Sequence, residues 1–194
     1  MKTTRLEAFS DGVLAIIITI MVLEMKAPEG ASWSDLRPVV SVFLTYLMSF
    51  VYVGIYWNNH HHMLQATERV TGGVLWANLH LLFWLSLIPF VTRWMEETHF
   101  APAPTALYGA VLLMSALAYV LMQTMIISIQ GSNSKLLQAV GSDVKGKASL
   151  VLYLTAMASA FWEPWIAVAL YVLVALMWLT PDRRIEKMLK DYDA

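Results

Sequence analysis

Residues 5–24 read RLEAFSDGVLAIIITIMVLE, and they indicate what kind of protein this is. They contain an uninterrupted apolar run, Gly12–Leu23, between the carboxylates of Asp11 and Glu24. Further charge-free runs follow along the chain. Continuous rather than alternating apolar runs are typical of membrane helices, because a helix satisfies its backbone hydrogen bonds internally. The sequence therefore predicts an all-α integral membrane protein with six transmembrane helices.

The other five predicted spans are delimited by charges and prolines. They are Pro38–Trp57, Val70–Thr92, a run within Phe100–Gln130, Ala148–Trp162 and Pro164–Pro181. The alternative is a single helix over residues 148–180, kinked at Pro164, which would leave Glu163 at mid-membrane at a high cost. We expect one six-helix transmembrane domain over residues 1–194, with residues 182–194 as a short cytoplasmic tail.

The composition excludes several classes of protein. The 194 residues are 58% hydrophobic and 14% charged, whereas an average soluble domain is about 25% charged. A net charge of −1 argues against a nucleic-acid partner. The chain has no cysteine and no catalytic motif such as HExxH or GxGD, so we expect no enzyme. The adjacent histidines His60–His62 point about 100° apart on a helix, so we predict no metal site and no cofactor.

The basic residues predict the orientation in the membrane. With six spans, ten of the 13 Lys and Arg residues fall on the side of the two chain ends, and the other three are Lys26, Arg37 and Arg93. Basic loops stay in the cytoplasm. We therefore expect both termini to be cytoplasmic.

The first apolar run is unusually short. The thirteen steps from Asp11 to Glu24 cover about 20 Å, whereas the hydrocarbon core is about 30 Å thick. We therefore expect this helix to lie inside a bundle or to line water. At about 100° per residue, one face carries Gly12, Ile16, Thr19, Ile20 and Leu23. The pattern alone leaves open whether this face packs against other helices, the commoner case, or lines a pore.

Several motifs resemble those of one channel family. Arg5-x-x-x-Phe9-Ser10-Asp11 resembles the signature at the first helix of the transmembrane protein 175 family of potassium-permeable channels. Trp57-x-x-His60, Asn78 and Pro89-Phe90 also resemble the family's pattern. The resemblance covers the chain to about Thr92, and the later spans match in length and number only. The single-unit length resembles the prokaryotic branch and implies a cell membrane.

This resemblance implies an architecture and a set of roles. The first helix would line a central pore, and a chain with one unit would form a homotetramer. The family's constriction falls five residues after the signature aspartate, at Ile16, with further apolar layers at Ile20 and Leu23 and an ion-selectivity layer at Thr19. A structural polar network would comprise Arg5, Ser10, Asp11, Trp57, His60 and Asn78. The expected partner of Asp11 is Trp57, His60 or Asn78.

The expected function is a potassium-permeable cation channel with modest preference for K+ over Na+. Apolar side chains at a constriction offer no oxygens to replace the hydration water of an ion. The expected partners are the lipid bilayer, potassium ions and further copies of the chain. The main alternative is a proton- or cation-coupled secondary transporter, although the inverted repeats typical of such proteins are not evident. We expect His80 to be a hydrogen-bonded core residue.

Overall fold

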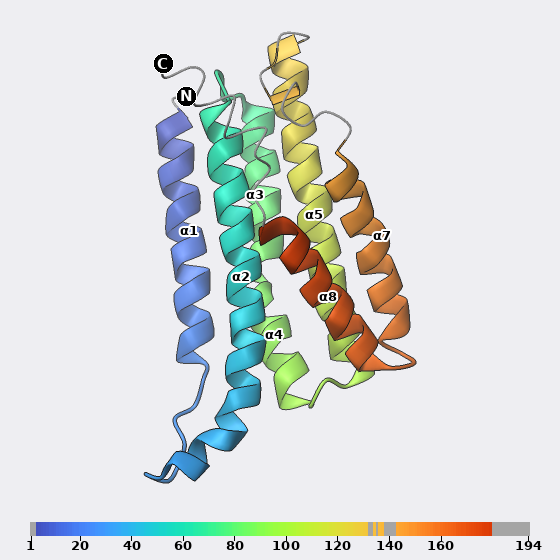
Figure 1. The fold of residues 1–194 in the computed structure, drawn as a ribbon. Helices are drawn as coiled ribbons and strands as arrows, with labels where there is room; N and C mark the ends of the chain where they lie inside the picture. Colours follow the sequence, from blue (N-terminus) through green and yellow to red (C-terminus); the bar gives the residue numbers. More distant parts are fainter. Residues whose placement is uncertain (1–2, 132–133, 135, 138–142, 180–194) are drawn as a thin grey trace.

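A computed structural model describes residues 3–131, 134, 136–137 and 143–179 (Figure 1). The predicted tail over residues 182–194 lies outside this part of the chain. The regular elements of the described residues are all helices. They are α1 (Thr3–Leu23), the short 3-10 helix η1 (Trp33–Leu36), α2 (Arg37–Gln65), α3 (Gly72–Ser86), α4 (Ile88–Glu97), α5 (Pro102–Gln130), α7 (Val144–Ser159) and α8 (Pro164–Leu179).

These helices make six spans, because α3 and α4 together form one. Four spans are long and apolar enough to cross a membrane, namely α1, α2, α3 with α4, and α5. The helices α7 and α8 have 16 residues each, or about 24 Å. The chain reverses between Ser159 and Pro164, so α8 runs back beside α7 (Figure 1). The six-helix prediction is confirmed, and Glu163 lies in the reversal rather than in the middle of one long helix.

The first helix is longer than its apolar run. It begins at Thr3 and has 21 residues, which is about 31 Å. The prediction of a helix too short for the bilayer is therefore wrong in its length, although its apolar part is short. Backbone hydrogen bonding continues through the polar first half, where Ser10 and Asp11 find partners on other helices.

The third predicted span, Val70–Thr92, is broken rather than continuous. It divides at Leu87 into α3 and α4. Pro89 lies in the first turn of α4 and has no N–H to donate to Leu85, so the helical ladder is interrupted there. This break sets the direction of α4 independently of α3.

The first helix lies at the edge of the bundle, where it contacts α2, α3 and α4 (Figure 1). The opposite half is built from α2, α5, α7 and α8 around buried tyrosines. The Tyr52 hydroxyl donates to the Tyr171 carbonyl at 2.6 Å, and the Tyr171 hydroxyl donates to the Thr105 carbonyl at 3.0 Å. These two hydrogen bonds satisfy the buried hydroxyls and join α2, α8 and α5 across the half of the bundle away from α1.

Candidate ion pathway and its polar anchors

The first helix has a packed face and an open face. Leu6, Ser10, Leu14, Ile17 and Met21 are buried against α2, α3 and α4. On the other side, Ile16 is 58% exposed, Ile20 42% and Leu23 80%. Gly12 and Thr19 are exposed on the same side. All the residues predicted to form the constriction therefore point away from the chain's own bundle, whereas Ile17, next to Ile16, points into it.

The open face borders a groove of about 690 Å³ between α1 and α4. Ile16 and Ile20 line it from α1, with Val13 and the almost fully buried Ile17 at its inner side, and Phe90 and Trp94 line it from α4. One end of the groove is charged: the Arg93 Nε donates to Glu97 Oε1 at 2.8 Å, and its Nη1 lies 3.9 Å from Glu24 Oε1. The groove is thus apolar along its length and carries more acidic than basic groups at that end.

Thr19 is the one hydroxyl on the apolar stretch of this open face among the residues described. Its Oγ1 donates to the Ile16 carbonyl at 2.9 Å. With its proton engaged by the backbone, the oxygen keeps its lone pairs for other partners. Thr19 can therefore accept from water or coordinate a cation, which its apolar neighbours cannot do.

A buried network ties α1 to α2 and α3. The Asn78 Nδ2 donates to Ser10 Oγ at 3.1 Å, and Asn78 Oδ1 lies 2.7 Å from His60 Nε2. An amide oxygen only accepts, so Nε2 is the protonated nitrogen of His60. Ser10, His60 and Asn78 are all buried. Three helices are therefore joined through one amide side chain.

A second set of contacts joins α1 to α2 nearer the surface. The Trp57 Nε1 donates to Asp11 Oδ1 at 3.0 Å, so Trp57 is the partner of Asp11 among the three candidates. One turn away, His61 Nδ1 lies 2.6 Å from Glu7 Oε1. This second pair was not among the contacts predicted from the sequence. The sequence does contain a pattern that could have predicted this pair: Glu7 precedes Asp11 by four residues, and His61 follows Trp57 by four. One helical turn therefore separates the two contacts on both helices.

Two residues lie elsewhere than the motifs suggested. Arg5 is exposed and forms no hydrogen bond or ion pair with the described residues of its own chain, so it stands outside the network within one chain. His80 is exposed rather than a core residue, which corrects the prediction. Its Nε2 does accept a hydrogen bond, from Trp84 Nε1 at 2.9 Å. The imidazole is satisfied along its own helix and needs no core partner.

Comparison with known proteins identifies the family. Residues 5–89 match the family described as the endosomal/lysosomal potassium channel TMEM175. A potassium channel of Chryseobacterium sp. (strain P1-3) is 57% identical over 191 residues, covering 98% of this chain and 100% of that protein. The chain belongs to the TMEM175 family. A potassium channel of Streptomyces collinus is 33% identical over 126 residues, 61% of each protein.

The three-dimensional fold agrees with the TMEM175 family. The crystal structure of a lysosomal potassium-selective channel TMEM175 homolog from Chamaesiphon minutus superposes with a TM-score of 0.78. It is 26% identical and the match covers 93% of this chain and 97% of that one. The resemblance inferred from the motifs is confirmed, and so is the prediction of a multi-pass membrane protein. TMEM175 is a family of ion channels and not of enzymes.

Proposed function

We propose that this protein is a potassium-permeable cation channel of the cell membrane, in which four copies surround a central pore with their α1 helices. Its relatives of similar length are named potassium channels. The observation that carries the proposal is the open face of α1, where Ile16, Thr19, Ile20 and Leu23 all point away from the chain's own core. Ile16, Ile20 and Leu23 form the constriction, and Thr19 provides the polar layer.

The chemistry of this face supports a pore better than contact with lipid. The face carries the Thr19 hydroxyl, and Glu24 follows it directly at the groove beside α1. Lipid tails offer nothing to the remaining lone pairs of the Thr19 oxygen or to the Glu24 carboxylate, whereas water and cations do. A ring of apolar side chains excludes water when narrow, so its radius and its apolarity set the barrier to an ion.

The apolar constriction also determines the proposed ion selectivity. Isoleucine and leucine offer no oxygen ligands, so the ion passes with partial loss of its hydration shell. That loss costs less for K+ than for the smaller Na+. Four Thr19 oxygens one turn away stabilise an ion or its water. The proposal is a modest preference for K+, because no ring of backbone carbonyls replaces the hydration shell.

The proposed assembly is one six-helix unit per chain, residues 1–194, with both termini and the 182–194 tail in the cytoplasm and no cofactor. The positive-inside asymmetry supports this orientation. The alternative of a coupled secondary transporter is not favoured, because the family is one of channels.

The test is to record current across bilayers containing the purified protein under opposing K+ and Na+ gradients. Ile16→Asn is expected to wet the constriction, raise the current and weaken the preference for K+. Ile16→Phe is expected to block current without harming assembly, because Ile16 is exposed within the chain.

Ile17→Leu is the matched control. Ile17 is the adjacent residue but is buried against the bundle, and a volume-conserving exchange there costs little stability, under about 1.5 kcal/mol. Its conductance and selectivity are expected to stay near those of the unmodified protein. If Ile16→Asn and Ile16→Phe leave current and selectivity unchanged, α1 does not line the pathway. If a polar residue at Ile17 opens the pore instead, the assigned face is wrong.

A further inference from the structure

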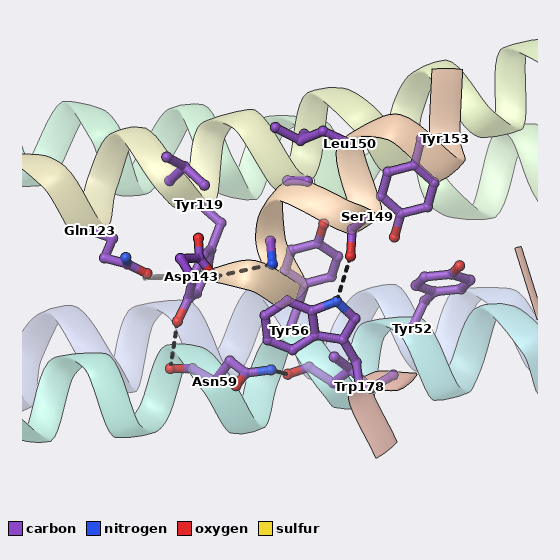
Figure 2. Close-up of a pocket in the computed structure, with 14 residues that line it drawn as sticks. Tyr52, Tyr56, Asn59, Tyr119, Gln123, Asp143, Ser149, Leu150, Tyr153 and Trp178 are labelled. Atoms are coloured by element: carbon purple, nitrogen blue, oxygen red, sulfur yellow. Dashed lines mark hydrogen bonds between the residues drawn. The ribbon is translucent and has the colours of Figure 1, made fainter. Parts of the chain in front are cut away.

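A cavity lined by aromatic residues lies between α2, α5, α7 and α8, in the half of the bundle away from α1 (Figure 2). Tyr52 and Tyr56 line it from α2, Tyr119 from α5, Tyr153 from α7 and Trp178 from α8. Measured as space open to the centres of water molecules, it is about 50 Å³. One water needs about 10–15 Å³ on this measure. The cavity therefore has room for a compact chemical group.

The polar groups of this cavity gather at one end. Figure 2 shows Asp143, Gln123 and Asn59 grouped at that end and Tyr52 and Tyr153 at the other. Asp143 is the one charged residue among the described residues that line the cavity. The site thus combines an aromatic interior with a single negative charge.

Gln123 adds a polar group to the lining of this cavity. The residue is 8% exposed and its side-chain amide forms no hydrogen bond with the described residues, whereas other polar groups of the lining do. The Tyr119 hydroxyl donates to the Asn59 carbonyl at 3.3 Å, and Trp178 Nε1 donates to Ser149 Oγ at 2.8 Å. The Gln123 amide lines the cavity and is free to bond to water or to a polar ligand there.

Asp143 is fixed at the polar end by the backbone. Its carboxylate accepts a hydrogen bond from Gly146 N at 3.1 Å and so caps the start of α7. Its backbone is in the left-handed region, with φ of 43°. The cap engages Oδ1, and Oδ2 forms no hydrogen bond with the described residues.

A neighbouring contact indicates what kind of ligand suits these rings. The Lys145 Nζ lies 6.0 Å from the centre of the Trp178 ring. An ammonium group therefore already lies over one aromatic wall of this region. Aromatic rings attract cations through their negative faces, and clusters of such rings are the usual binding sites for methylated ammonium groups.

We propose that this cavity binds a small methylated ammonium group, with its positive charge against Asp143 and its methyl groups among the tyrosines. A carboxylate rejects anions, and the aromatic lining favours a cation of low hydration over K+ itself. The site is separate from the α1 face, since none of its lining residues belongs to α1. The proposal therefore does not depend on ion conduction.

The experiment measures binding of choline to the purified protein in a maltoside detergent, by calorimetry and by the shift of the unfolding temperature. The neutral analogue 3,3-dimethylbutan-1-ol has the same shape without the charge. Choline is expected to bind and to raise the unfolding temperature, and the neutral analogue is not. Equal binding of both compounds, or binding of neither, would overturn the proposal.

Asp143→Asn is the decisive variant. Asparagine caps helices as well as aspartate does and tolerates left-handed backbone, so the fold is expected to persist while the charge is lost. Choline affinity should fall by at least about tenfold. Asp35→Asn is the matched control, because Asp35 also accepts hydrogen bonds near the start of a helix but lies on η1. Unchanged affinity in Asp143→Asn would refute the assignment.

Two further arms locate the ligand and its source. Ile16→Phe should leave choline binding intact. If this variant loses choline binding, the ligand binds at the α1 face instead, and the proposal is overturned. Competition by phosphatidylcholine, but not phosphatidylglycerol, in nanodiscs would identify a lipid headgroup as the source of the ammonium. Absence of competition would identify a free cation, and both results support the ammonium site.

Discussion

Replacing Asn78 by leucine tests the buried network that holds α1 to the bundle. Leucine has a similar size but no hydrogen-bonding group. The His60 Nδ1 is buried and already lacks a partner among the described residues. After Asn78→Leu, the 2.7 Å contact to Nε2 is also lost, so neither ring nitrogen of His60 is satisfied.

The magnitude follows from the groups that lose their partners. A stranded buried donor costs about 1–3 kcal/mol, and an ordinary hydrogen bond contributes about 0.5–1.5 kcal/mol. The stranded donor is His60 Nε2, and the lost bond is the one from Asn78 to Ser10 Oγ. Ser10 itself keeps its bond to the Leu6 carbonyl at 2.9 Å. We therefore expect Asn78→Leu to lower the free energy of unfolding by about 2–4 kcal/mol.

The assay is unfolding of the purified protein in mixed micelles with increasing mole fraction of sodium dodecyl sulfate. Thr124→Val is the control, because Thr124 is exposed and, among the described residues, its hydroxyl bonds only the Val120 carbonyl of its own helix. Its effect should stay within about 0.5 kcal/mol. In the double variant with Ser10→Ala, the two losses should not add, because both residues share one hydrogen bond. Strict additivity, or a loss from Asn78→Leu no larger than the control's, would refute the network as an anchor.

Two other predictions concern packing and orientation. Gly109→Ala should lower the free energy of unfolding by about 1–3 kcal/mol, because an added Cβ would collide with the Tyr171 hydroxyl. Gly54 has open space around it, so Gly54→Ala should be neutral or stabilising in the same assay. Equal effects of the two substitutions would contradict the packing around Gly109. The chain has no cysteine, so cysteines placed singly at the exposed Val144 and Trp33 can be labelled in intact cells with an impermeant maleimide. The proposed orientation requires labelling at position 33 and none at position 144, and the reverse pattern would show that it is inverted.

Much of the architecture could be predicted because the bilayer restricts what a chain can do. A backbone that crosses hydrocarbon must satisfy its own hydrogen bonds, so a long apolar run such as 100–130 has to be helical. The high cost of a carboxylate at mid-membrane explains why Glu163 could be placed between two helices from the sequence alone. The helical period of 3.6 residues per turn also predicted that Ile16, Ile20 and Leu23 share one face of α1.

The rotation of each helix about its axis was decided only by tertiary packing. Periodicity shows which residues of α1 share a face, but not whether that face is open or packed. The burial of Ile17 and the exposure of Ile16 settle this for the chain itself. The choice of Trp57 as the partner of Asp11 is of the same kind, because the motifs left three candidates and only the relative rotation of α1 and α2 selects one.

The aromatic cavity could not be predicted from sequence patterns either, because it depends on how distant helices pack. Its walls come from four helices between Tyr52 and Trp178, more than a hundred residues apart. No local spacing marks such residues as neighbours. The sequence by itself determined which segments are helical and which of their residues share a face. Only the tertiary structure decided which faces meet, because contacts between distant segments depend on how all the helices pack together.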